Sequence, residues 1–148
     1  MSRKPQNISG PIRKIIQNAR VARLASLDSK GRPHIVPVCF AYDGKAFYSA
    51  VDRKPKRVRP ERLVRLQNIR AVPQVALLID EYDDDWTQLW YVLIRGQADL
   101  IPNSAHQERA RAIRTLKAKY PQYAHGMLAE DAPILRITPA RTTSWGKI

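Results

Sequence analysis

The 148-residue sequence contains almost no cysteine, little histidine and no long apolar run, and each shortage excludes a class of protein. A single cysteine, Cys39, cannot form an internal disulfide, so a disulfide-stabilised scaffold is excluded. The three histidines, His34, His106 and His125, lack the spacing of metal ligands. No apolar stretch reaches the roughly 18 residues of a membrane span, and the N-terminus lacks the apolar segment of a signal peptide. We therefore expect a single cytoplasmic domain over residues 1–148.

Familiar catalytic motifs are also missing. The sequence has no nucleophile elbow, no zinc-protease HExxH motif, no P-loop and no GxGxxG dinucleotide motif, so nucleophilic hydrolysis has no support. The acidic triplet Asp83-Asp84-Asp85 lacks the glycine and the distal glutamate of a calcium loop, which favours a solvated hairpin tip.

Positive charge is what the sequence has in excess. Lys and Arg number 26 against 13 Asp and Glu, which gives a formal net charge of +13 and a pI near 10.4. Such a surplus attracts nucleic acid, anionic membranes or phosphorylated small molecules. The basic residues concentrate between positions 52 and 70, whereas the acidic residues gather between positions 80 and 85. The surface is therefore expected to be electrically polarised.

Hydrophobic periodicity divides the chain into helices and strands. Apolar residues at helical spacing between Ile12 and Ala19 predict an opening helix, and a second helix is expected from Pro60 to about Asn68. Ser104 and Gln107 predict a capping box for a third helix that stops at Pro121. Alternation predicts strands over residues 21–27, 34–42, 45–51, 74–82, 89–101 and 133–145, with a bulge at Gly96.

This order of elements predicts a mainly β fold with flanking helices. Because alternating β-α units are missing, we expect a small, closed or half-closed antiparallel barrel. The first three strands should form a meander. The run 34–42 is apolar on both faces, which predicts a well-covered strand in which Pro37 sits where no ladder donor is needed.

The third predicted strand runs directly into a cationic turn, Asp52-Arg53-Lys54-Pro55-Lys56-Arg57. Guanidinium and ammonium groups that converge there can neutralise a terminal phosphate through charge-assisted hydrogen bonds. The same residues can equally be solvated loop charges. Spacing alone leaves both interpretations open.

Three segments occur in a recognisable order: GRPHIVPV at 31–38, FYSAVDRKPKR at 47–57 and NIRAVPQVALLI at 68–79. Together they resemble the pyridoxamine 5'-phosphate oxidase-like, FMN-binding split-barrel family. The loop 83–86 and the segment Leu89-Trp90-Tyr91-Val92 are similar to its branch of probable F420-dependent oxidoreductases. The resemblance covers about residues 10 to 101, and the last strand more weakly.

The resemblance implies a six-stranded antiparallel split β-barrel that forms a homodimer, with a flavin or deazaflavin in a groove at the subunit interface. It implies coenzyme F420, with FMN as the alternative, and hydride transfer to or from a small organic substrate. In such an enzyme the cofactor carries the chemistry, so no acid-base pair is required. The sequence does not show the full set of substrate-phosphate residues of the true oxidases, so vitamin B6 chemistry is not implied.

The resemblance also implies cofactor-binding residues. Lys54, Lys56 and Arg57 would hold the phosphate, with Arg53 next to them, although Pro55 inside the turn departs from the family pattern. The ring of the cofactor would lie along Val36, Pro37 and Val38, and Ser49 and Ala50 would offer further contacts.

Two other interpretations of the sequence stay open. The protein could be a non-catalytic binder, either of duplex nucleic acid through the arginine face Arg59, Arg62 and Arg65 of the second predicted helix, or of another cofactor in the same barrel. A single-stranded nucleic-acid groove is disfavoured, because no aromatic residue lies between positions 52 and 70. The aromatic residues Trp86, Trp90, Tyr91 and Trp145 either line the substrate side of the groove or belong to the core.

Overall fold

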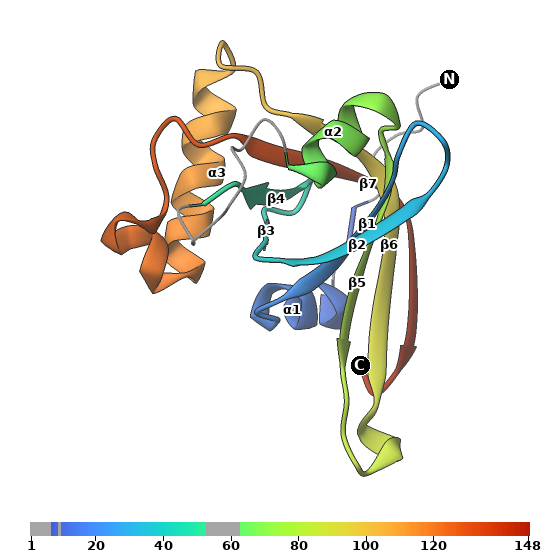
Figure 1. The fold of residues 1–148 in the computed structure, drawn as a ribbon. Helices are drawn as coiled ribbons and strands as arrows, with labels where there is room; N and C mark the ends of the chain where they lie inside the picture. Colours follow the sequence, from blue (N-terminus) through green and yellow to red (C-terminus); the bar gives the residue numbers. More distant parts are fainter. Residues whose placement is uncertain (1–6, 9, 53–62) are drawn as a thin grey trace.

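The computed structural model describes residues 7, 8, 10–52 and 63–148, and its centre is one antiparallel sheet (Figure 1). The strands are β1 (Ala22–Leu27), β2 (Pro33–Val38), β3 (Ala41–Tyr42), β4 (Phe47–Ala50), β5 (Gln74–Glu81), β6 (Trp90–Leu100) and β7 (Ile134–Gly146). The helices are α1 (Gly10–Asn18), α2 (Val64–Ala71) and α3 (His106–Lys119), with short helical turns η2 (Trp86–Gln88) and η3 (Tyr123–Met127).

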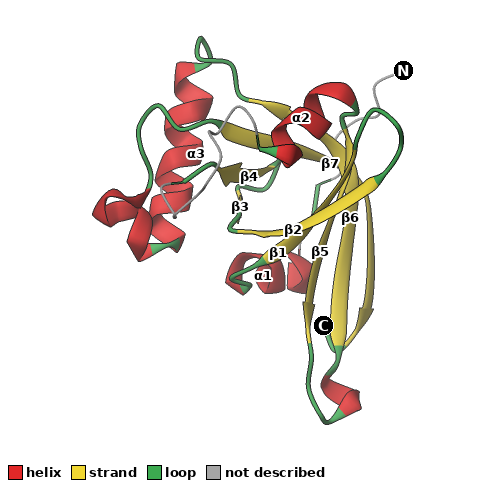
Figure 2. Cartoon of the chain, viewed as in Figure 1, coloured by secondary structure: helices red, strands yellow, loops and turns green. Residues whose placement is uncertain are grey.

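Within these residues the sheet has seven strands in the order β2-β1-β5-β6-β7-β4-β3. It curls into a half-barrel (Figure 2), since only Cys39 and Phe40 separate β2 at one edge from β3 at the other. The mainly β class with flanking helices and the split barrel are confirmed. The strand number was wrong by one because the predicted strand 34–42 breaks after Val38. The hydroxyl of Tyr120 accepts a hydrogen bond from the Phe40 N–H at 3.0 Å, so this backbone group leaves the ladder.

The pairings of the predicted meander are confirmed, because β1 pairs with β2, and β3, the far end of the predicted strand 34–42, pairs with β4. The break after Val38 places these two pairs at opposite edges of the sheet. β4 also pairs with β7, and Phe47 lies opposite Ile137 in the register. All four residues of β4 are buried, so this short strand needs a neighbour that covers it. The long C-terminal strand supplies that cover from more than 80 residues further along the chain.

The second strand lies at an edge of the sheet. β2 pairs with β1, and Pro37 stands opposite Arg23, so the expected edge-compatible place for this proline is confirmed. The expected cover on both faces is wrong, because Ile35 is 65% exposed. The alternation of a strand sends Ile35 to the opposite face from Val36 and Val38, and only the latter two pack against the core.

The core fills the concave side of the half-barrel. Alternate residues of three strands are fully buried there, among them Leu24, Leu77 and Ile94. Ile16 of α1 and Leu66 of α2 close this cluster. A second cluster forms where Leu116 and Ala112 of α3 pack on Tyr48 of β4 and Ile134 of β7.

The helices follow the predicted pattern except at one cap. α3 begins at His106 after Ala105, and no side chain caps it, so the capping box of Ser104 and Gln107 is wrong. The helix does end before Pro121, as expected. No helix in the described part of the chain is long and apolar enough to cross a membrane.

Candidate functional site

A buried polar cluster lies at the end of β4. Asp52 lies two residues beyond the last residue of β4 and is 9% exposed, and its carboxylate accepts a 2.6 Å hydrogen bond from the hydroxyl of Tyr123. Burial, together with this bond to Asp52, raises the pKa of Tyr123 far above its usual value. The tyrosine therefore stays protonated and holds the carboxylate in place from η3.

Arg65, in the first turn of α2, completes the cluster. Its guanidinium is half-buried, and its Nε atom is buried without a hydrogen-bond partner among the described residues. Burial lowers the pKa of Arg65, while the negative charge of Asp52 acts in the opposite direction. A buried guanidinium N–H that lacks an acceptor is costly. An anionic acceptor at this point would satisfy it.

The start of α2 adds to this positive environment. Leu63 stands at the cap position, and no side chain from the part of the chain that the structure describes caps the helix. The amide groups of a first helical turn point at a bound anion and carry a partial positive charge. The helix is held on the sheet by Leu66 and Ile69 in the core and by a 3.1 Å hydrogen bond from Asn68 Nδ2 to Ser26 Oγ. Because these contacts hold α2 on the sheet, they also fix the position of the Arg65 backbone.

This placement corrects one expectation. Periodicity put Arg65 on an outer face of the helix with Arg59 and Arg62, but its side chain lies half-buried beside Asp52 instead. Arg59 and Arg62 lie outside the described residues. The predicted phosphate residues Arg53, Lys54, Lys56 and Arg57 also lie outside them, so their role stays a prediction from the sequence.

The residues predicted to lie along the cofactor ring occupy two faces of β2. Val36 and Val38 point toward the core, whereas Pro37 is exposed on the other face. A flat ring on one face of a strand meets alternate side chains. Side-chain contact on the open face is therefore limited to Pro37 and its neighbour Ile35.

Ser49 and Ala50, predicted to contact the cofactor, are buried in β4. Ser49 is 2% exposed and Ala50 is 6% exposed. They are the last two residues of β4, and Asp52 of the candidate anion site follows two residues after Ala50. Their contact with a cofactor stays a prediction.

The convex side of the sheet forms an open apolar face. We define it by residues whose side chains alternate with the buried core residues and lie opposite one another in register: Ala25, Ile35, Ala76, Leu78, Tyr91, Leu93 and Trp145. Ile35 and Trp145 are 65% and 53% exposed, and the other members are half-buried. Contiguous exposed apolar surface of this kind marks an interaction site. Tyr91 stacks on Trp145 with ring centroids 6.0 Å apart.

The acidic loop closes the long β5–β6 hairpin. Asp85 caps η2 by accepting a 3.0 Å hydrogen bond from the Thr87 N–H, and Asp83 accepts one from the Asp85 N–H at 2.8 Å.

Of the aromatic residues considered from the sequence, Trp86 is 72% exposed, so it is not part of the hydrophobic core. Trp90 packs against the core and donates a hydrogen bond to Glu81 at 3.3 Å.

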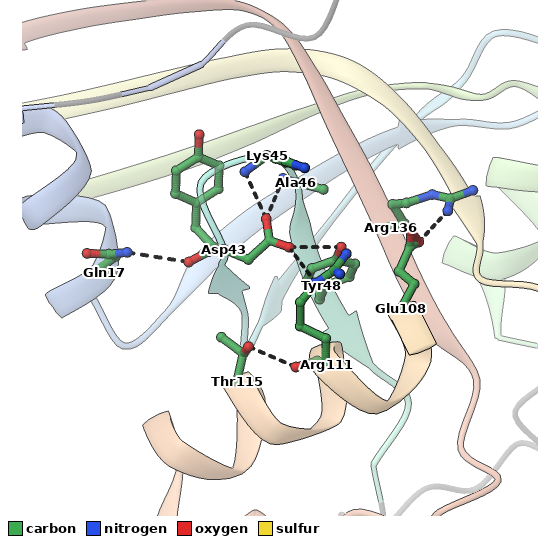
Figure 3. Close-up of polar contacts among 10 residues, drawn as sticks. Gln17, Asp43, Lys45, Ala46, Tyr48, Glu108, Arg111, Thr115 and Arg136 are labelled. Atoms are coloured by element: carbon green, nitrogen blue, oxygen red, sulfur yellow. Dashed lines mark hydrogen bonds and ion pairs between the residues drawn. The ribbon is translucent and has the colours of Figure 1, made fainter. Parts of the chain in front are cut away.

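A second polar network, around Asp43, is structural. Figure 3 shows Asp43 accepting hydrogen bonds from the N–H groups of Lys45 and Ala46 and facing Tyr48 and Arg111. Burial would raise the pKa of Asp43, but these bonds outweigh it and lower the pKa. The network ties α3 to the β3–β4 hairpin.

The chain belongs to the family described as pyridoxamine 5'-phosphate oxidase, because residues 8–146 match that family. No curated protein matches the chain.

Solved structures share this fold at low sequence identity. HutZ, described as the heme storage protein from Vibrio cholerae, is 14% identical with a TM-score of 0.70, and 96% of each chain is covered. An FAD-binding protein from Mesorhizobium loti is 22% identical with a TM-score of 0.67, covering 94% of this chain and 95% of that one. An F420 reductase is 19% identical with a TM-score of 0.63, covering 92% of this chain and 98% of that one.

Proposed function

We propose that the protein is an oxidoreductase that uses coenzyme F420 and acts on a small organic substrate. The observation that carries the proposal is Arg65 at the start of α2, whose buried Nε has no acceptor within residues 7, 8, 10–52 and 63–148. Family membership and the fold shared with an F420 reductase and an FAD-binding protein support it. FMN is the alternative cofactor.

In this proposal the anionic part of the cofactor lies at the start of α2. Arg65 would donate to it, with the cations of the sequence segment 53–57 as further ligands. The net charge of +13 favours the longer, polyanionic tail of F420 over the single phosphate of FMN. The bound cofactor supplies hydride transfer, while the protein orients the cofactor and excludes water.

A direct titration tests the cofactor assignment. Purified protein is titrated separately with F420, FMN and hemin, and binding is followed by fluorescence or absorbance. Hemin is included because a heme storage protein shares the fold. We expect F420 to bind more tightly than FMN. Equal or better binding of FMN would overturn the F420 assignment, and binding of hemin alone would overturn the oxidoreductase proposal.

We also propose that two copies of the chain pair through the open apolar face. Dimers with closed symmetry use one self-complementary patch, and this face is apolar at its centre, with Arg23, Arg95 and Arg141 among the polar residues on the same side. One half-barrel cannot enclose a flavin-sized ligand on all sides. A second copy would provide the missing wall of the groove.

Ile35→Asp is expected to convert the dimer to a monomer at micromolar concentration. Ile35 is 65% exposed, so the substitution leaves the fold of one subunit nearly unchanged. A carboxylate buried without a partner costs about 3 kcal/mol, which raises the dimer dissociation constant on the order of a hundredfold. Light scattering measures the change.

Val64→Asp is the matched control, because Val64 is 48% exposed on α2 and lies outside the open apolar face. It should remain dimeric. A parent protein that is monomeric with cofactor bound would contradict the shared groove.

A further inference from the structure

A pocket is lined by residues other than those of the cluster at the end of β4. It has a volume of about 370 Å³ and is formed by the ends of α1 and α3 on either side of β3. Its lining residues are Gln17, Asn18, Arg20, Ala41, Tyr42, Thr115, Ala118 and Lys119. Figure 3 shows Gln17 of α1 and Thr115 of α3 on either side of the β3–β4 hairpin.

The charged residues of this pocket are both cations. The Nζ atom of Lys119 is buried, has no hydrogen-bond acceptor in the described part of the chain, and lies 3.7 Å from the centroid of the Phe40 ring. Arg20 donates a 2.6 Å hydrogen bond to the backbone carbonyl oxygen of Lys119, so its guanidinium lies at the end of α3. In addition to burial, its positive charge there acts on the Lys119 ammonium group and lowers the pKa of Lys119. Within the described residues neither cation forms an ion pair with a carboxylate.

The positive charge of Lys119 in this pocket is not balanced by a nearby negative charge among the described residues. Burial first, and then repulsion from Arg20, lowers the pKa of Lys119 to about 8. The aromatic face of Phe40 offsets part of the desolvation of the ammonium group, but a ring accepts no proper hydrogen bond. None of the described residues that line the pocket carries a negative charge.

The ends of the two helices do not supply that charge. α1 and α3 both turn their C-termini toward the pocket, and each end carries the equivalent of about half a negative charge. At the end of α3, the carbonyl oxygen of Lys119 already accepts a hydrogen bond from Arg20. The positive charges of Arg20 and Lys119 together exceed the partial negative charges of the two helix ends, so the pocket favours an anion.

We propose that this pocket binds a compact oxyanion, a carboxylate or phosphate group of a small metabolite, between Arg20 and Lys119. Arg20 is exposed at the pocket and presents a fork of donors to an anion. Lys119 has a flexible stem that can carry its ammonium group from the ring to the ligand. A volume of about 370 Å³ lies at the small end of the usual range for ligand sites. The pocket therefore has room for a small oxyanion, and none of its lining residues belongs to the cluster of Asp52, Arg65 and Tyr123.

Calorimetric titration with sodium phosphate and with sodium acetate, at constant ionic strength in chloride, tests the proposal. We expect saturable binding of at least one anion, and the stronger of the two identifies the class of metabolite. Lys119→Gln and Arg20→Gln should each weaken binding at least about tenfold, since each removes a charged donor. Lys14→Gln, at an exposed position of α1, is the matched control and should bind like the parent. The absence of saturable binding, or unchanged binding by Lys119→Gln, would overturn the proposal.

A second measurement uses the unaltered chain. The pKa of Lys119 is followed by NMR with and without phosphate. The titratable and charged groups around its ammonium are Arg20 before β1, Cys39 between β2 and β3, Tyr42 on β3 and Tyr120 at the end of α3. A bound anion stabilises the charged form, so the pKa should rise from about 8 by roughly 1 to 3 pH units. An unchanged value at saturating phosphate would contradict the site.

Discussion

Arg65→Ala is expected to weaken F420 and FMN binding by roughly tenfold to a hundredfold. A hydrogen bond to a charged group contributes roughly 1.5 to 3 kcal/mol, and the substitution removes the donor that the structure leaves without an acceptor. Arg65→Lys keeps the charge but loses the fork of donors, so it should recover only part of the affinity. Fluorescence titration of the purified variants measures both losses.

The matched control is Arg70→Ala, on the same helix but exposed. It should bind the cofactor like the parent protein. Equal affinities of Arg65→Ala and the parent would show that Arg65 does not hold the anion. The sequence-predicted ligands Lys56 and Arg57 would then be the residues to test, each with an expected loss of roughly tenfold to a hundredfold on substitution by alanine.

Tyr123 acts on this site through Asp52. Its hydroxyl donates a 2.6 Å hydrogen bond to the carboxylate, which in turn interacts with Arg65. Tyr123→Phe therefore leaves the guanidinium in place but frees Asp52 to move toward it and compete with a bound anion. The variant should lose less affinity than Arg65→Ala, and the same titration measures it.

Local features of the fold could be predicted because they depend on neighbouring residues. In β5 and β6, apolar and polar residues alternate because one face of this hairpin is buried and the other is not. Gly96 falls in that alternation at the point where the register between β6 and β7 shifts, so the predicted bulge is confirmed. The order of the strands depends on pairing between strands that are far apart in the sequence, such as the pairing that places Phe47 of β4 opposite Ile137 of β7. Local sequence patterns do not predict such pairings.

The candidate sites were harder to predict for the same reason. Helical periodicity describes which side of α2 is apolar, but not that the end of β4 lies against its first turn. The partners of Arg65 and Lys119 come from distant segments: Asp52 and Tyr123 for the first, Phe40 for the second. Only the accumulation of positive charge near residue 57 pointed from the sequence toward an anion site in this part of the chain.

Gly96→Ala is expected to destabilise the protein by about 3 kcal/mol, which lowers Tm by roughly 10 °C for a chain of this size. A Cβ atom at Gly96 would lie 2.2 Å from the carbonyl oxygen of Thr138 and 3.2 Å from Cα of Pro139. Both atoms belong to the backbone of β7, so no side-chain rotation can relieve the contact. The two longest strands of the sheet would have to separate at the bulge.

Gly31→Ala separates steric contact from backbone conformation. Gly31 has a φ of +76° in the turn before β2, but a Cβ atom there would meet nothing within 4 Å. Its cost is the strain of a left-handed alanine alone, about 1 to 2 kcal/mol. Thermal melts followed by circular dichroism should therefore show a clearly larger loss for Gly96→Ala than for Gly31→Ala. Equal melting temperatures would mean that β7 can move away from β6 at the bulge without disturbing the half-barrel, and the close approach at Gly96 would then have no structural role.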